Sequence, residues 1–171
     1  RHLGDWTGSG PAPVRVEVPQ VARPTRPRVF LVDQPGAVQA NIFAGHVLPP
    51  STDPGAVALE TSTEALGGSF TSRLNMNLRE RKHWSYGART SVMGALGQRP
   101  FLAVAPVQID KTAQSMAEIQ REIAAYATGE APATQAEVGK VVANELRSQP
   151  GAYETASAVL GTLGTIVRYG R

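Results

Sequence analysis

Two stretches in the first third of the chain have the apolar patterning of β-strands. Residues 28–33 form a compact apolar run that predicts a buried strand, and residues 38–47 alternate between two faces as a half-buried strand does. The Gln34-Pro35-Gly36-Ala37 sequence between them is typical of a turn. We therefore expect residues 28–47 to form a β-hairpin.

Helix signals follow the hairpin. Asp53 is a favourable N-cap residue, and Pro54 suits the first helical position because its missing N–H has no partner to lose there. This predicts a helix to about Leu66 that stops at Gly67-Gly68, and a second helix from residue 69 or 71 to about residue 83.

Two further strands and three helices are predicted in the rest of the chain. Residues 85–95 and 101–108 are expected to be strands, joined by a turn at 97–100. Asp110 is expected to cap a third helix, whose apolar face is formed by Ala113, Met116, Ile119, Ile123 and Tyr126. The last two helices are marked by a capping box, Thr134-Gln135-Ala136-Glu137, and by an apolar stripe of Leu160, Leu163, Ile166 and Val167.

The predicted order ββααββααα indicates an α+β fold, with an antiparallel or mixed sheet backed by helices. Residues 28–171 are expected to form this one domain. Residues 1–27 are predicted to be a proline-rich linker, in which Val14, Val16 and Val18 would suit a short edge strand.

Composition removes several classes of protein. The 171 residues contain no cysteine, which excludes disulfides and thiolate metal sites. The formal net charge of +3 is mildly basic and not gathered in long runs, so a nucleic-acid protein is possible but disfavoured. No apolar run approaches the length of a membrane span. The chain opens on Arg1 without a methionine, which suggests a fragment or a processed chain.

The histidines do not form a metal motif. They occur at positions 2, 46 and 83, and no two are one helical turn apart. A zinc site within this chain is therefore not expected. His46 is expected to be a hydrogen-bonded residue at a strand end, and His83 to lie at a helix C-terminus, where a partly charged imidazole is favourable.

The segment with the most candidate chemistry is residues 66–88. It gathers four cationic side chains and two aromatic ones, namely Arg73, Arg79, Arg81, Lys82, Trp84 and Tyr86. Three interpretations compete: a solvated helix face followed by core aromatic residues, a nucleic-acid patch, or a site that grips a peptide carbonyl.

The same segment closely resembles the signature of the C-terminal half of pitrilysin/insulinase-type zinc metallopeptidases, the inverzincins, which include the mitochondrial processing peptidases. The matching residues are Gly67-Gly68, Ser69-Phe70-Thr71-Ser72-Arg73-Leu74, Asn77-Leu78-Arg79-Glu80 and Tyr86-Gly87-Ala88. Outside the motif, Gln39, the Asp53-Pro54 helix start, the capping-box helix and Arg168-Tyr169-Gly170 sit where such domains have similar residues, so the resemblance covers roughly 28–171.

The resemblance implies a division of labour between two halves of a clam-shaped enzyme. One half holds zinc through an inverted His-x-x-Glu-His motif, which this chain lacks. The facing half supplies an Arg and a Tyr seven positions apart that bind the substrate backbone and stabilise the tetrahedral intermediate. Arg79 and Tyr86 have this spacing and match those positions. His83-Trp84 departs from the family pattern, in which Gly followed by an aromatic residue is common.

The sequence thus predicts the substrate-binding half of a zinc-dependent metalloendopeptidase, inactive by itself. Its expected partners are a zinc-bearing domain or subunit of the same family, in a homo- or heterodimer if separate, and a peptide substrate bound extended along a sheet edge. The resemblance favours a bacterial, periplasmic protein. Arg73 and Trp84 are expected to serve structure. The alternative is a non-catalytic structural or interaction protein of the same fold.

Overall fold

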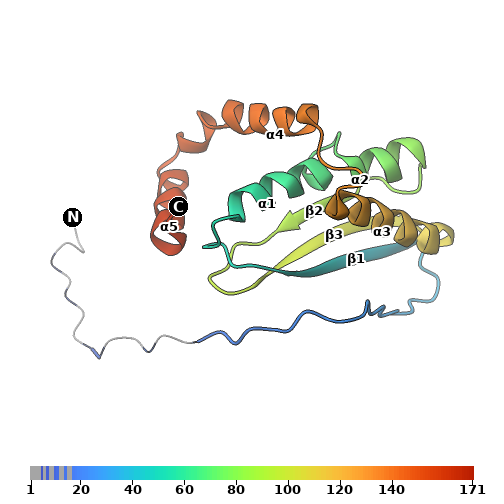
Figure 1. Ribbon diagram of the computed structural model, residues 1–171, viewed down its shortest axis with the longest axis horizontal. Helices are drawn as coiled ribbons and strands as arrows, with labels where there is room; N and C mark the ends of the chain where they lie inside the picture. Colours follow the sequence, from blue (N-terminus) through green and yellow to red (C-terminus); the bar gives the residue numbers. More distant parts are fainter. Residues whose placement is uncertain (1–4, 6, 8–9, 12–13, 15–16) are drawn as a thin grey trace.

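The computed structural model describes residues 17–171 together with residues 5, 7, 10, 11 and 14 (Figure 1). Of the expected edge strand at 14–18, residues 15 and 16 lie outside the described residues, and Val14, Glu17 and Val18 are not in a strand. None of the helices described is both long and apolar enough to cross a membrane.

Three strands and five α-helices make up the described fold. The strands are β1 (Gln39–Leu48), β2 (Arg89–Val92) and β3 (Arg99–Gln108), and the helices are α1 (Ala56–Thr63), α2 (Arg73–Asn75), α3 (Thr112–Thr128), α4 (Gln135–Ser148) and α5 (Ala156–Tyr169). Two π-helical segments, η1 (Glu64–Gly68) and η2 (Met76–Arg81), continue α1 and α2. Two short 3-10 turns, η3 (Ile109–Lys111) and η4 (Gly151–Tyr153), precede α3 and α5.

The sheet is antiparallel, with strand order β1-β3-β2. β3 pairs over its full length with β1, from Gln39 opposite Gln108 to Leu48 opposite Arg99. The shorter β2 pairs with the middle of β3, and Arg89 lies opposite Val104. The α+β fold class is confirmed.

The core lies between the sheet and the helices above it in Figure 1. Every second residue of β3 faces this core, so that Ala103, Ala105 and Val107 are at most 1% exposed. Leu74 from α2 and Ile119 from α3 cover them. Burying such side chains contributes roughly 1.5–3 kcal/mol each, which fixes α2, η2 and α3 on one face of the sheet.

The predicted strand at 28–33 is wrong, so the observed order begins with one strand fewer. Phe30, Leu31 and Val32 are 80%, 87% and 88% exposed and belong to no strand. The turn at 34–37 is confirmed, because the Ala37 N–H donates to the Gln34 carbonyl at 3.2 Å. A continuous apolar run is stable as a strand where both faces are covered, whereas the helices lie on one face of this sheet (Figure 1).

Several predicted boundaries are also wrong. α1 begins at Ala56 rather than Pro54, because Asp53 closes a turn: its carboxylate accepts the Gly55 N–H at 2.8 Å and its carbonyl accepts the Ala56 N–H at 2.9 Å. In place of an Asp110 cap, η3 precedes α3, which begins at Thr112 with no side-chain cap. The strand expected at 85–95 is reduced to β2.

The last three helices keep their predicted order. The capping box of α4 is confirmed, with Thr134 and Glu137 bonded reciprocally. The predicted face of α3 is partly wrong, since Ser115 is fully buried while Met116 is 37% exposed. Neither α4 nor α5 contains a buried residue.

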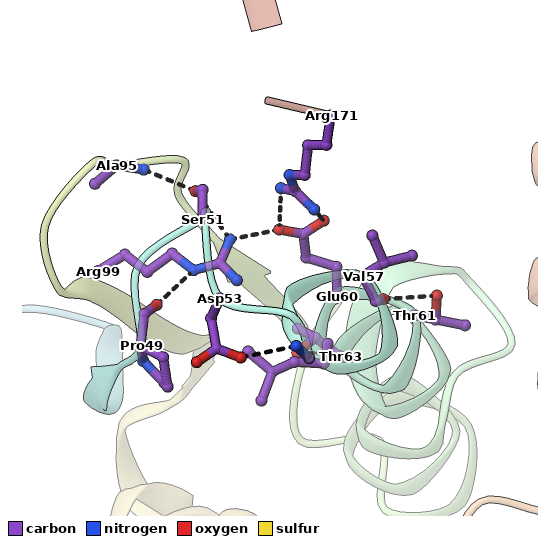
Figure 2. A network of polar contacts seen from close by, with 12 residues as sticks. Pro49, Ser51, Asp53, Val57, Glu60, Thr61, Thr63, Ala95, Arg99 and Arg171 are labelled. Atoms are coloured by element: carbon purple, nitrogen blue, oxygen red, sulfur yellow. Dashed lines mark hydrogen bonds and ion pairs between the residues drawn. The ribbon is translucent and has the colours of Figure 1, made fainter. Parts of the chain in front are cut away.

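A buried guanidinium connects β3 to the start of α1 and to the last residue of the chain (Figure 2). Arg99 is 1% exposed and donates to the Pro49 carbonyl, the Ser51 hydroxyl and the Glu60 carboxylate. Arg171 donates to the same carboxylate at 2.7 and 3.0 Å. Burial would by itself raise the pKa of Glu60, but hydrogen bonds from Arg171 and Arg99 outweigh burial and lower it.

Within its described residues, the predicted linker is hydrogen-bonded to the domain through Val21. The side-chain amide of Gln98, in the β2–β3 connection, accepts the Val21 N–H at 2.5 Å and donates to the Val21 carbonyl at 3.1 Å. The amide thus makes the pair of bonds that a neighbouring strand would make.

Candidate functional site

Two π-helical segments border the region that contains the predicted site. η1 ends at Gly67 and Gly68, and η2 carries Arg79. Such segments are rare within helices and occur often at functional sites. Gly67 is pressed against β2, since a Cβ built on it would lie 2.6 Å from the Thr90 nitrogen. No larger residue fits there, so η1 is held tightly to the sheet edge.

Arg79 is held by an aromatic ring while its charge stays accessible. Its guanidinium carbon lies 4.3 Å from the ring centroid of Phe70, a cation–π contact. The side chain is 37% exposed. Its one ion pair among the described residues is with Glu80 at 3.4 Å, and a pair this exposed contributes little. The guanidinium is therefore oriented but free to donate to a ligand.

His83, two residues after the end of η2, has a left-handed backbone conformation, with φ of 56°. Its N–H donates to the Arg79 carbonyl at 3.1 Å, and the Trp84 N–H donates to the Leu78 carbonyl at 2.9 Å. The prediction of a helix C-terminus is confirmed. Glycine is the residue best suited to this conformation. At position 83, where the family commonly has Gly, the backbone therefore adopts the left-handed conformation with a histidine in place of the glycine.

Tyr86 lies in a loop, not at the start of the strand as expected. Ser85 forms an isolated bridge with Val107, and its hydroxyl accepts the Gly87 N–H at 3.1 Å and donates to the Pro106 carbonyl at 2.5 Å. The Ser85 hydroxyl thus bonds main-chain groups that would otherwise pair with the backbone of a strand. The strand β2 begins three residues after Tyr86. Tyr86 is consequently displaced outward and is 83% exposed.

An open cavity of about 400 Å³ lies where η1, η2 and β2 meet. Its lining consists of Gly67, Gly68, Ser69, Phe70, Asn75, Arg79, Gly87, Ala88, Arg89 and Pro106. Arg79 is thus in the wall, and Tyr86 immediately precedes the wall residue Gly87. Neither predicted site residue is buried in the interior of the domain.

Asn75 joins two segments that line this cavity, and this role was not predicted from the sequence. It is 4% exposed, its amide N–H donates to the Phe70 carbonyl at 2.5 Å, and its oxygen accepts the Ala88 N–H at 3.0 Å. One side chain therefore joins the two walls. Nothing in the sequence distinguishes it from a polar residue on an exposed helix face.

Arg73 and Trp84 have the structural roles expected of them. Arg73 donates to both carboxylate oxygens of Glu137 at 2.6 Å and to the carbonyls of Ala131 and Pro132, which joins α2 to α4. Trp84 packs against the core. The two-pronged bond from Arg73 lowers the pKa of Glu137 to about 2, against the effect of partial burial.

The described residues contain no group of three or more His, Asp or Glu side chains placed to hold a metal ion. His46 makes a 3.2 Å contact with the Val47 carbonyl and lies against the Phe101 ring. It is therefore the hydrogen-bonded residue near a strand end that the sequence predicts.

Solved structures with a similar fold include proteins from three bacteria. One is titled as the peptidase M16 inactive domain from Pseudomonas fluorescens (TM-score 0.70, 21% identity, 78% of this chain and 32% of that chain). The second is a protease from Helicobacter pylori (TM-score 0.71, 23% identity, 80% and 33%). The third is a conserved protein from Enterococcus faecalis (TM-score 0.65, 20% identity, 76% and 30%). The chain spans about a third of the length of each.

Sequence comparison identifies the family. None of the curated proteins compared with the chain matches it. Residues 1–145 match the family described as the peptidase M16 inactive domain, which is a non-catalytic domain of the M16 metallopeptidases. The match covers most of the chain and includes the cavity with Arg79 and Tyr86. The chain belongs to the peptidase M16 inactive-domain family.

Proposed function

We propose that this chain is the substrate-binding half of a zinc-dependent metalloendopeptidase whose zinc is held by another domain or subunit. The observation that carries the proposal is Arg79, oriented by Phe70 in the wall of an open cavity and free to donate hydrogen bonds. The family is that of zinc-dependent peptidases, in which inactive domains pair with a catalytic domain. Zinc would supply the activated water that attacks the peptide bond.

Arg79 and Tyr86 supply complementary donors for this reaction. A guanidinium and a phenol both donate hydrogen bonds, and the carbonyl oxygen of the attacked peptide gains negative charge in the transition state. Tyr86 is 83% exposed and immediately precedes the lining residue Gly87. In the proposed complex both donors reach a peptide that lies across the opening of the cavity. Removing one such donor typically costs about 2.7–4 kcal/mol, or 10²–10³ in rate.

The test uses this chain assembled with its zinc-bearing partner, covalently linked or separate. We expect Arg79→Ala and Tyr86→Phe each to lower kcat/KM for a peptide by about 10²–10³, with unchanged zinc content and unchanged far-UV circular dichroism. Arg147→Gln is the matched control, because Arg147 is an exposed α4 residue outside the cavity lining. Normal turnover in both site variants would instead favour a structural role for the domain.

A further inference from the structure

We propose that Arg89 selects peptides that carry a carboxylate next to the group held by Arg79 and Tyr86. The inference rests on the proposed function and adds a specificity-determining residue to it. Arg89 is the first residue of β2 and lies opposite Val104. Thr90 is buried, lies against Gly67 of η1 and donates to the Thr63 carbonyl of α1. The preceding residue, Arg89, is exposed and lines the cavity.

The charges of the cavity wall all have one sign. Its lining residues include Arg79 and Arg89 and no Asp or Glu. Within the described part of the chain, Arg89 makes no ion pair, and Arg79 makes only the 3.4 Å contact with Glu80. The carboxylate of Glu64, the first residue of η1, lies against Gly68, but Glu64 is not among the lining residues. The cavity therefore attracts an anionic group.

The shape of the cavity suits a peptide side chain. Gly67, Gly68 and Gly87 line it, so main-chain groups rather than side chains form much of the wall. Gly67 is fixed against Thr90, and Asn75 fixes Ala88 to Phe70. These contacts hold the cavity open in a defined shape, so binding does not have to order its walls first.

The anionic groups of an unmodified peptide at neutral pH are carboxylates. Guanidinium groups bind carboxylates with two parallel hydrogen bonds, which gives direction as well as attraction. The carboxylate can belong to an Asp or Glu side chain or to the C-terminus of a short peptide. Because the cavity is open to solvent, the expected preference is modest, about 3- to 10-fold in kcat/KM.

The experiment measures this preference by internal competition in the assembled enzyme. Each reaction contains three competing peptides of one core sequence: a Gln peptide with an amidated C-terminus, the same peptide with one Gln replaced by Glu, and the Gln peptide with a free C-terminus. The Glu is moved to another position around the cleaved bond from one reaction to the next. Mass spectrometry gives the ratios of kcat/KM. We expect one Glu position, or the free C-terminus, to be favoured by about 3- to 10-fold at low salt and less at high salt.

Variants assign the preference to a residue. Arg89→Gln is expected to bring the ratio close to one, and Arg147→Gln is expected to leave it unchanged. Equal rates for all three peptides in the wild type, or a preference that survives Arg89→Gln, would overturn the inference while leaving the proposed function intact. If the assembled enzyme with its zinc cleaves none of the peptides, the proposed function fails and the inference with it.

Discussion

Glu137 offers the sharpest test of how this domain is held together. Its carboxylate binds Arg73 of α2 through two 2.6 Å hydrogen bonds, and it also closes the capping box of its own helix α4. Glu137→Gln removes the charge but keeps the capping box, because glutamine serves equally well at that position. The variant therefore isolates the ionic contact between α2 and α4.

The size of the effect follows from the pKa of Glu137. Hydrogen bonds from Arg73, with smaller contributions from Thr134, lower this pKa from 4.5 to about 2. At full weight that difference corresponds to ~3 kcal/mol of stability at pH 7. The Glu137 side chain is 29% exposed, so solvent screening lowers the expected loss in Glu137→Gln to about 1–2 kcal/mol.

The sign of the pH dependence is fixed by the direction of the shift. Because the pKa of Glu137 is lower in the folded protein, its contribution is present above pH 4.5 and is lost as the pH falls towards 2. At pH 3 less than half of the Glu137 contribution to the free energy of unfolding should remain. The free-energy difference between wild type and Glu137→Gln should therefore shrink between pH 7 and pH 3.

Urea unfolding followed by circular dichroism measures this difference at both pH values. Comparing the two proteins at each pH cancels the contributions of other carboxylates, such as Glu118, whose pKa is also lowered to about 2 by hydrogen bonds from Arg121 and Asn77. Glu154→Gln is the control, since Glu154 is exposed and forms no ion pair with a described residue. An equal difference at pH 7 and pH 3 would refute the assignment.

Three further predictions concern stability and are checked by the same unfolding assay. Ser115→Ala should raise the free energy of unfolding by about 0.5–1 kcal/mol, because the buried Ser115 hydroxyl has no hydrogen-bond partner among the described residues; a loss would show that the hydroxyl is bonded. His83→Gly should leave stability unchanged or raise it, whereas His83→Val should lower it by about 1–2 kcal/mol, since φ is 56° there; equal effects would contradict the left-handed conformation. Gly67→Ala should cost about 1–3 kcal/mol, because its Cβ would lie 2.6 Å from the Thr90 nitrogen; a neutral result would mean that η1 is not tight on β2.

Local chemistry allowed part of the fold to be predicted. The capping box at Thr134, the strand at 101–108 and the glycine stop after α1 are confirmed, because each depends on a few adjacent residues. The strand at 28–33 could not be judged in this way. Whether an apolar run is covered on both faces depends on where distant helices pack, and the sequence contains no local signal for that.

The roles of Arg79 and Tyr86 stay a prediction. Both side chains are accessible, as a substrate-binding role requires, and Arg79 lines the cavity. Asn75, which joins two walls of the cavity, was missed because its role arises from a contact with Ala88, thirteen positions away. Outside the cavity, Arg99 was placed in a turn, whereas it lies in β3 and is buried by partners about forty to fifty positions away.

The central claim is that Arg79 and Tyr86 bind the same reacting carbonyl group from this domain. The most direct measurement is a double-mutant cycle on kcat/KM in the assembled peptidase, with Arg79→Ala, Tyr86→Phe and the double variant at constant zinc content. The account predicts that each single variant loses about 10²–10³ in kcat/KM and that the double variant loses less than the product of the two. Wild-type kcat/KM in either single variant would contradict it.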